Sequence, residues 1–383
     1  MKIVIAPDKF KGCLTAAGVS QAIARGLKAV DATVSIDECP MADGGEGTVA
    51  ALVSATGGRF ITKRVTGPLP EMKVDATFGL LGDGITAVIE MSAASGLALL
   101  KPEDRNPLYT TTFGTGELIN AAIAMGAKKI ILGIGGSATV DGGIGCAQAC
   151  GHTIILEGGE PVSPTEPLIG ADLQQVVLIK RHRGEKTDGV PILVACDVEN
   201  PLCGPQGAAE IYGPQKGATP PQVRQLDSAL RQLAIRLNQV ALADVPGAGA
   251  AGGLGFGMMA YFGATLRSGV EIVIEATKLR DRLRGAQWCI TGEGRLDAQS
   301  ASGKTTAGVA RLCREMGVPC IAIAGSIGDQ AEKMMAEGLT AYFGICNRPM
   351  TLDEAMRNAP DLLATTAANV FRNVSEITSR FTK

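Results

Sequence analysis

The stretch RFITKRVTGPLPEMKVDATFGLLGDGITAVIEM (Arg59–Met91) decides the fold. It holds three β-prone runs, Arg59–Thr66, Lys73–Leu80 and Ile85–Met91, and the turn-forming sequences GPLPE and GDG separate them. Connections this short join antiparallel neighbours, so the stretch predicts an antiparallel meander. A simple doubly wound sheet contains no such meander, and we therefore expect a second domain to begin here.

The sequence on either side of the meander has a different rhythm. Strand Lys2–Ala6, a helix capped by Thr15, strand Thr33–Glu38 and helix Thr48–Thr56 precede it, and strands alternate with helices again from Gln287 onward. Such alternation is typical of a parallel sheet. We predict an α/β protein in which both termini form one Rossmann-like parallel-sheet domain and an α/β domain with a mixed sheet is inserted.

The predicted boundaries are 1–62 plus 272–383 for the Rossmann-like domain and 63–271 for the inserted domain. Between the meander and its end, the inserted domain is expected to hold a helix near Gly116–Met125, strands Lys129–Leu132 and Pro191–Cys196, and a helix Gln222–Ala241. Clefts between domains are common ligand sites, so the active site is expected in the interdomain cleft.

Composition excludes several classes of protein. The chain has 383 residues, a net charge of −2 and only 4% aromatic residues, which argues against a nucleic-acid partner. Its ten cysteines form no CxxC and lie mostly in apolar runs, which predicts reduced, buried thiols. No targeting signal is visible, so a cytoplasmic location is expected. Val245–Leu266 is uncharged but rich in glycine, which favours a loop followed by a buried helix over a membrane span.

Four loops share glycines, a carboxylate and small hydroxyl residues directly after a predicted strand. They are ADGGEGT (Ala42–Thr48), GIGGSATVDGG (Gly133–Gly143), ACDVENPLCG (Ala195–Gly204) and TGEGRLDAQSASGK (Thr291–Lys304). Glycine lets backbone N–H groups approach an anion closely. Carboxylates beside a phosphate require a cation between them, and Mg²⁺ is the usual one. The loops therefore indicate a site for nucleotide phosphates and Mg²⁺.

Histidine is scarce, because the chain contains only His152 and His182. Two histidines make a Ser-His-Asp hydrolase improbable, so we expect carboxylates or lysines to act as the general acid or base. Phosphoryl transfer suits such a chain, because there the protein mainly positions groups and neutralises charge.

Two motifs offer alternatives. AQSASGKT (Ala298–Thr305) nearly matches a P-loop, although alanine replaces the first glycine and the loop is long. GIGGSA (Gly133–Ala138) fits a dinucleotide fingerprint, and Glu157 stands near the place of a ribose-binding acid. Asp141 and two further glycines stand where the helix of that fingerprint belongs. A nicotinamide-dependent oxidoreductase therefore stays open at this point.

The chain resembles the class I glycerate kinases, also called glycerate 2-kinases, over nearly its whole length. The resemblance is carried, in order, by MKIVIAPDKFKG.LTA, ADGGEGTVAALV, VTGPL, IEMSAASGL, TTTFGTGELI, GIGGSATVDGG, ACDVENPLCGPQGAA, GPQKGA, VPGAGAAGGLGFG, SGVEIV and TGEGRLDAQSASGK. It implies ATP- and Mg²⁺-dependent phosphorylation of D-glycerate to 2-phosphoglycerate, and a Rossmann-like domain with an inserted α/β domain. Lys9 and Val140 depart from residues common in the family, serine and asparagine.

The loops and the resemblance together give a set of candidate residues. We predict that ATP phosphates are bound by Gly44, Gly45, Gly47, Gly135, Gly136, Ser137 and Thr139. The predicted Mg²⁺ ligands are drawn from Asp43, Glu46, Asp141 and Asp197. The predicted catalytic residues are Asp197, Asp141, Lys304, Arg295 and Lys11, with Asp197 handling the C2 hydroxyl proton. The predicted substrate contacts are Glu90, Ser95, Arg105, Thr115 and Asn200.

The predicted function is thus a glycerate 2-kinase with ATP and D-glycerate as substrates, no nucleic-acid or membrane partner, and a monomeric or homodimeric state. Besides the oxidoreductase, a non-catalytic sugar-acid sensor is an alternative, although a sensor would not need four acid-bearing glycine loops.

Overall fold

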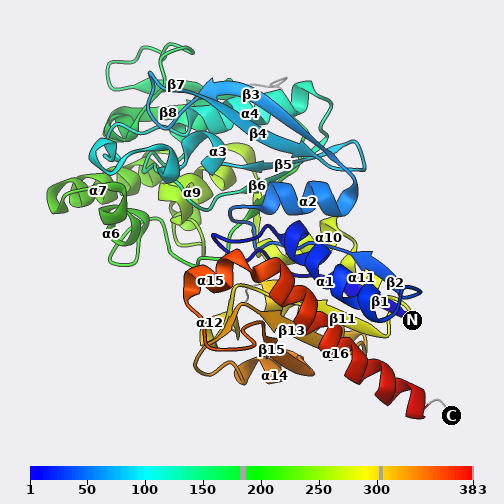
Figure 1. Ribbon diagram of the computed structural model, residues 1–383. Coiled ribbons are helices and arrows are strands. Elements are labelled where there is room, and N and C mark those ends of the chain that lie inside the picture. Colours follow the sequence, from blue (N-terminus) through cyan, green and yellow to red (C-terminus); the bar gives the residue numbers. More distant parts are fainter. Residues whose placement is uncertain (182–186, 302–304, 382–383) are drawn as a thin grey trace. The chain divides into compact units, whose positions relative to one another are not determined.

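The structure is a computed structural model that describes residues 1–181, 187–301 and 305–381 (Figure 1). The chain divides into two compact units. Unit 1 comprises Met1–Asp43, Ala50–Gly57 and Val270–Lys383, and unit 2 comprises Gly44–Val49 and Gly58–Gly269. Each unit has its own sheet and its own apolar core.

Unit 1 is built on a five-stranded parallel sheet of order β15-β13-β11-β1-β2. Its strands are β1 (Lys2–Ile5), β2 (Ser35–Glu38), β11 (Trp288–Thr291), β13 (Cys320–Ala324) and β15 (Ala341–Gly344). Counted along the chain, this is the order 2-1-3-4-5 of a doubly wound fold. In that order the direction of winding reverses between β1 and β11, which is where such folds bind ligands.

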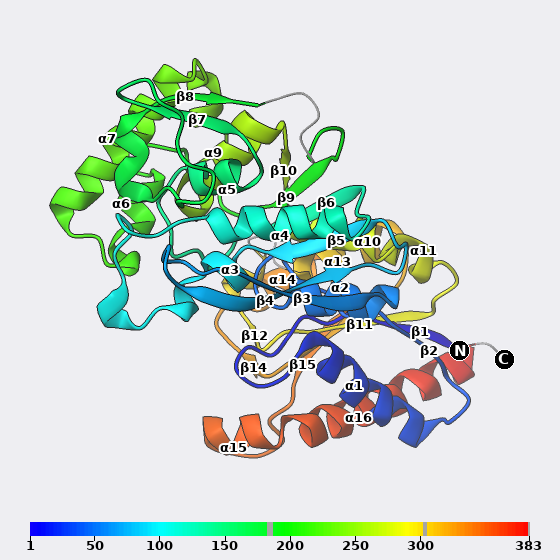
Figure 2. The same cartoon turned by 90° about the horizontal axis from the view of Figure 1, so that it is seen from above.

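Two helices from opposite ends of the chain lie side by side on unit 1, α1 (Ala16–Val30) and α16 (Ala359–Phe381) (Figure 2). Thr15 caps α1 as predicted, because its side chain accepts a hydrogen bond from the Gly18 N–H. A Cβ on Gly26 would lie 2.1 Å from the carbonyl oxygen of Ala364, so only glycine permits this approach. The two termini therefore form one domain.

Unit 2 is built on a six-stranded mixed sheet of order β10-β9-β6-β5-β4-β3. The strands are β3 (Arg59–Thr66), β4 (Lys73–Leu80), β5 (Thr86–Glu90), β6 (Lys129–Gly133), β9 (Ile192–Ala195) and β10 (Thr265–Arg267). The first three form the antiparallel meander that the sequence predicts, and β5, β6, β9 and β10 are parallel. The predicted fold class is confirmed by these two sheets.

The remaining elements connect and cover the sheets. Unit 2 contains α3 (Ser92–Ser95), α4 (Phe113–Ala124), α5 (Ile144–Ala149), β7 (Thr153–Leu156), β8 (Val176–Lys180), α6 (Ala208–Tyr212), α7 (Pro220–Arg236), α8 (Val240–Ala243) and α9 (Ala250–Phe262). Two helices, α2 (Thr48–Thr56) and α10 (Gly269–Ala276), begin in unit 2 and lie mostly in unit 1. Unit 1 adds α11 (Leu279–Leu283), β12 (Arg295–Leu296), α12 (Ala298–Ala301), α13 (Thr305–Glu315), β14 (Ser326–Ile327), α14 (Lys333–Glu337) and α15 (Leu352–Arg357).

The glycine-rich stretch Val245–Leu266 becomes a loop and the buried helix α9. Ala251, Gly252 and Gly253 have left-handed backbone angles, so regular helix follows only after Gly253. Within the described residues, no helix is both long enough and apolar enough to cross a bilayer.

The cysteines form no disulfide within the part of the chain that the structure describes. Three of them, Cys289 on β11, Cys313 on α13 and Cys320 on β13, are fully buried, and their Sγ atoms lie within 4.8 Å of one another. They fill unit 1 as small apolar side chains, in keeping with the predicted buried thiols.

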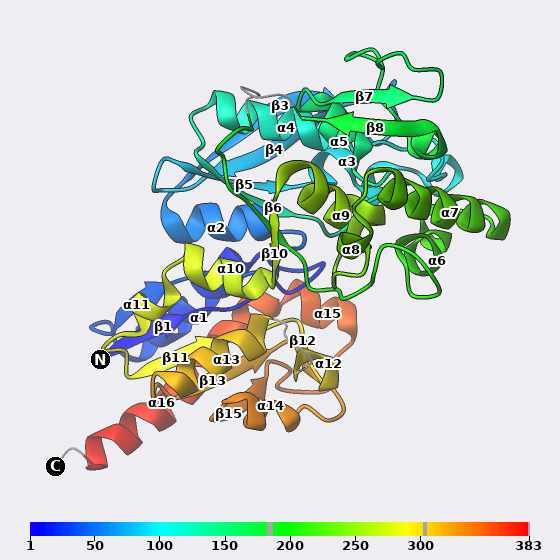
Figure 3. The same cartoon turned by 180° about the vertical axis from the view of Figure 1, so that it is seen from behind.

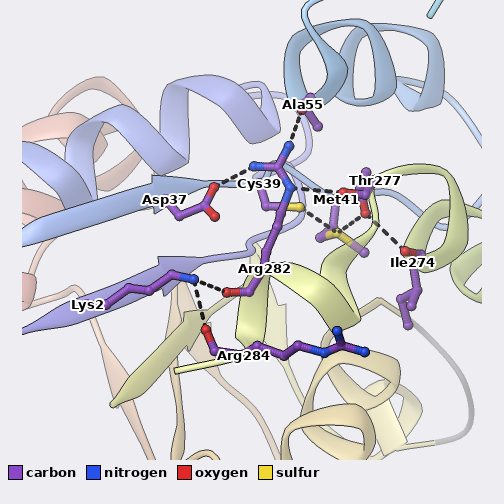
Figure 4. Close-up of polar contacts among 9 residues, drawn as sticks. All are labelled: Lys2, Asp37, Cys39, Met41, Ala55, Ile274, Thr277, Arg282 and Arg284. Carbon is purple, nitrogen blue, oxygen red and sulfur yellow. Dashed lines mark hydrogen bonds and ion pairs between the residues drawn. The ribbon is translucent and has the colours of Figure 1, made fainter. Parts of the chain in front are cut away.

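Arg282, on α11, ties three parts of unit 1 together (Figure 4). Its guanidinium pairs with Asp37 on β2, donates 2.5 Å to the Ala55 carbonyl at the end of α2, and donates 2.9 Å to the Thr277 carbonyl. Its own carbonyl accepts a 2.6 Å hydrogen bond from Lys2 Nζ on β1. The planar fork of the guanidinium makes this three-way contact possible.

Replacing Arg282 with lysine is expected to lower the free energy of unfolding of unit 1 by about 1–3 kcal/mol, because one ammonium cannot satisfy three separated acceptors. Urea unfolding measures the loss. Arg280→Lys on the same helix is the matched control, since Arg280 pairs with Glu315 where both side chains are more than half exposed. We expect that control to change stability by less than about 0.5 kcal/mol. Equal losses in the two variants would contradict the role of Arg282.

Candidate active site

Four parallel strands of unit 2 end at one edge of their sheet. In register, Glu90 of β5 pairs with Gly133 of β6, and Ala195 of β9 pairs with both Gly133 and Arg267 of β10. The loops that follow these strands therefore start side by side. Ligands of α/β sheets bind outside the carboxyl ends of the strands.

The loop Gly44–Val49 packs onto the same edge. A Cβ on Gly133 would lie 2.3 Å from the Gly44 carbonyl oxygen, and a Cβ on Gly44 would lie 2.5 Å from the Ala195 Cβ. The backbone N–H of Val49 donates 2.8 Å to Glu90 Oε1. Three of the four predicted glycine-rich loops therefore come together within unit 2, and close backbone approach explains their glycines.

The loop after β6 presents backbone rather than side chains. Gly135 and Gly136 are exposed, whereas Ser137 is 7% exposed and Thr139 is fully buried. A Cβ on Gly135 would stand 3.4 Å from the Gly45 Cα, so this loop faces the Gly44–Val49 loop. Exposed Gly135 and Gly136, opposite the partly buried Gly45 and Gly47, leave room for an anion to approach backbone N–H groups.

Lys216 is hydrogen-bonded to the loop after β6, and it was not among the site residues predicted from the sequence. It ends a 3₁₀ turn, Pro214–Lys216, is only 2% exposed, and its Nζ donates 2.7 Å to Ser137 Oγ and 2.7 Å to the Thr139 carbonyl. Burial lowers the pKa of Lys216 to about 7, while the nearby charge of Asp141 raises it. The motif GPQKGA carried the only sequence signal for this lysine.

Asp141 is fully buried and hydrogen-bonded at both carboxylate oxygens. Oδ2 accepts from the Thr112 N–H at 2.8 Å and from Thr112 Oγ1 at 2.7 Å, and Oδ1 accepts from the Gly143 N–H at 3.1 Å. Burial raises the pKa of Asp141, and the hydrogen bonds from Thr112 lower it. This geometry supports a role in fixing the loop, while its predicted catalytic and Mg²⁺-binding roles stay predictions.

Asp197, unlike the buried Asp141, is exposed, and it lies just beyond the end of β9. Its Oδ1 accepts from the Gly269 N–H at 2.9 Å and from Ser268 Oγ at 3.0 Å. The two hydrogen bonds fix the orientation of the carboxylate while the residue remains accessible to a ligand. Asp197 is therefore suited to handle a proton at this edge of the sheet.

The five predicted substrate contacts fall into different settings. Ser95 Oγ and Thr115 Oγ1 lie 3.0 Å apart and are fully buried, and Glu90 holds the Val49 N–H. Asn200 donates to the Gln206 carbonyl and accepts from the Tyr212 hydroxyl.

Arg105, the fifth predicted contact, is half-buried. Its Nε has no hydrogen-bond partner among the described residues. A Cβ on Gly217, the residue after Lys216, would lie 2.1 Å from the Arg105 carbonyl oxygen. Of the five predicted substrate contacts, Arg105 is the one with a side-chain donor that lacks a partner among the described residues, which suits it to bind an anionic ligand.

Unit 1 carries a second group of polar loops, at the switch point between β1 and β11. The Asp8 N–H donates 2.8 Å to the Gly292 carbonyl, and Asp8 Oδ2 accepts a 2.6 Å hydrogen bond from Thr305 Oγ1. Burial raises the pKa of Asp8, while Lys9 lowers it. Asp8 belongs to the motif MKIVIAPDKFKG, but the sequence alone predicted no role for it.

Three predicted catalytic residues belong to these unit 1 loops. Lys11 is exposed, and Arg295 pairs with Asp297 at 3.0 Å with its side chain 66% exposed. Lys304 lies outside the described residues, as does part of the P-loop-like segment Ala298–Thr305. Asp43, a predicted Mg²⁺ ligand, also belongs to unit 1. The roles of these residues stay predictions.

The dinucleotide fingerprint at Gly133–Ala138 is wrong. That motif needs a helix straight after the glycines and a neighbouring parallel strand that ends in the ribose-binding acid. Here the next helix starts only at Ile144, and β7, which precedes Glu157, pairs antiparallel with β8 in a separate two-stranded sheet (Figure 3). The helix expected near Gly116–Met125 is α4, which begins earlier, at Phe113, with Thr112 before it.

Comparison with known proteins identifies the family. The family model described as "Glycerate kinase family" matches residues 3–375. The chain is 47% identical to a glycerate kinase of Haemophilus influenzae, covering 97% of this chain and 98% of that one. It is 45% identical to a glycerate 2-kinase of Escherichia coli K12, covering 97% of each chain.

A solved structure agrees with these relatives. The crystal structure of a protein assigned as glycerate kinase 2 from Salmonella typhimurium LT2 has a TM-score of 0.88 at 43% sequence identity and covers 99% of both chains. A match this complete in sequence and in fold extends over both units and all the loops described above. The chain belongs to the glycerate kinase family and is a kinase.

Proposed function

We propose that this chain transfers the γ-phosphoryl group of ATP to the C2 hydroxyl of D-glycerate, giving 2-phosphoglycerate and ADP. The family supports a kinase acting on glycerate, and the name of the Escherichia coli relative, glycerate 2-kinase, supports the position of transfer. The structural observation that carries the proposal is the convergence of three glycine-rich loops at the carboxyl edge of β5, β6 and β9.

The phosphates of ATP are bound by the backbone N–H groups of Gly44–Gly47 and Gly135–Ser137. Contact between Gly133 and the Gly44 carbonyl holds the two loops together, and the exposed glycines place no side chain over the amides. Because these donors are fixed before the substrate arrives, they need no reorganisation during the reaction.

The acidic residues of the same loops fit Mg²⁺, which prefers one or two carboxylates together with phosphate oxygens. Glu46 is the exposed carboxylate of the Gly44–Val49 loop, and Asp197 is the first exposed carboxylate after β9; both would hold the ion. When bound, Mg²⁺ neutralises charge on the transferring phosphoryl group. Asp141 has both oxygens occupied by protein donors, so it positions the loop instead.

Asp197 accepts the proton of the C2 hydroxyl as that oxygen forms its bond to the γ-phosphorus and the bond to the bridging oxygen of ADP breaks. The N–H of Gly269 and the hydroxyl of Ser268 hold the carboxylate in place for this step. The half-buried Arg105 binds the carboxylate of glycerate, because its guanidinium matches a carboxylate with two parallel donors.

A coupled assay with ATP, Mg²⁺ and D-glycerate tests the proposal. We expect ADP release that requires glycerate, and we expect enolase alone to convert the product to phosphoenolpyruvate. ADP release without an enolase signal would contradict transfer to the C2 oxygen. No ADP release under these conditions would contradict the proposed activity as a whole.

A further inference from the structure

Lys216 is a buried charge with a defined place in unit 2. It is among the largest fully buried side chains of the described residues, and it contacts the loop after β6 at Ser137 and Thr139, both at 2.7 Å. Its turn is locked in position, because Gly217 has a φ of +91° and no space for a Cβ against the Arg105 carbonyl. The backbone that carries Lys216 is therefore fixed beside the backbone of Arg105.

A buried ammonium is costly unless an anion compensates its charge. One acceptor of Lys216 is a hydroxyl and the other is a carbonyl, and neither carries a formal charge. The charged group that acts on the pKa of Lys216 is Asp141, whose own oxygens are occupied by Thr112 and Gly143. In the free protein Lys216 therefore has no hydrogen-bonded anion among the described residues, and the charge of Asp141 offsets only part of the effect of burial on its pKa.

We propose that Lys216 becomes the buried cation of the phosphate-binding loop by taking up a proton when a nucleotide triphosphate binds to Gly135–Ser137. This inference rests on the proposed function, because it takes that loop as the phosphate site. Lys216 is a positioning residue in this account, since it acts on the ligand through Ser137 and Thr139.

The direction of the proton movement follows from the charges. Burial holds the pKa of Lys216 at about 7 in the free protein, so above pH 7 the amine is mostly neutral. A bound polyanion stabilises the charged form and raises this pKa, so binding draws a proton from solvent. Affinity for ATP is then greatest below the free pKa and falls as the pH rises above about 7, by up to about tenfold for each unit of pKa shift.

Isothermal titration calorimetry measures the proton directly. ATP with Mg²⁺, and without glycerate, is titrated at pH 8 in two buffers with different enthalpies of ionisation, and the difference in heat gives the number of protons bound. We expect the protein to take up a proton fraction on the order of one half to one. Lys216→Met keeps an unbranched side chain one atom shorter and without charge, and it is expected to bind ATP about tenfold more weakly, with no uptake.

Two further variants make the result decisive. Lys216→Arg stays charged across this pH range, so if it folds it is expected to bind ATP without proton uptake. Lys128→Met, at an exposed lysine of the same unit, is expected to retain the full uptake. ATP binding without uptake by the unaltered protein, or uptake that persists in Lys216→Met, overturns the inference and leaves the proposed function standing. Absence of ATP binding at any pH contradicts the proposed function itself.

Discussion

Replacing Asp197 with asparagine is expected to lower kcat by about 10²–10⁴-fold, the usual contribution of a positioned general base. Asparagine can still accept the hydrogen bonds from Gly269 and Ser268, so the loop keeps its shape, but it cannot take the C2 hydroxyl proton. Because Asp197 is exposed, we expect thermal unfolding to change little. The measurement is kcat from the coupled assay, together with Tm.

Glu199→Gln is the matched control for Asp197, because it removes a carboxylate from an exposed residue of the same loop. We expect this variant to keep near-normal turnover. Near-normal turnover in Asp197→Asn would remove Asp197 from the chemistry. Equal losses in both variants would mean that the loop responds to its total charge and not to one positioned base.

Asp141→Ala is expected to produce the largest loss of stability. The change leaves the N–H and hydroxyl of Thr112 and the N–H of Gly143 without their acceptor in a fully buried place. The unsatisfied buried donors and the lost side chain together are expected to lower the free energy of unfolding by about 3 kcal/mol. For a unit of this size we expect a fall of about 10 °C in the Tm of the transition that unfolds unit 2.

The control for Asp141 is Asp75→Ala, also in unit 2, where the carboxylate is 65% exposed and pairs with Arg64 at 3.5 Å. That variant is expected to shift stability by less than about 0.5 kcal/mol. If Asp141→Ala lost activity without any loss of stability, the sequence-based prediction of a catalytic or metal-binding Asp141 would be favoured over the loop-fixing role.

The sequence was most informative about elements whose signals are local. The strands Arg59–Thr66 and Lys73–Leu80 were predicted with the bounds that the structure has, because short turns separate them clearly. The helix predicted over Gln222–Ala241 instead spans Pro220–Arg236. Its apolar spacing continues past the end, but Asn238 adopts a left-handed φ of 54° and stops the helix. Periodicity alone could not show where that stop lies.

The candidate site was predictable only in part, for the same reason. Glycine-rich loops with carboxylates can be recognised in the sequence. The contacts that decide which of these carboxylates are buried and which are exposed cannot. Asp141 and Asp197 look equivalent in sequence, yet one is buried under Thr112 and the other is exposed. Lys216 lies 79 residues from Ser137 in the sequence, so no local pattern could reveal their hydrogen bond.

Hydrogen–deuterium exchange with and without ATP and Mg²⁺ tests the central claim most directly. The claim is that the facing loops of unit 2 bind the nucleotide phosphates. We predict that ATP slows exchange of the backbone amides over Gly44–Gly47 and Gly135–Ser137. Protection confined to the unit 1 loops over Asp8–Lys11 and Gly292–Asp297, with no change in the unit 2 loops, would contradict it.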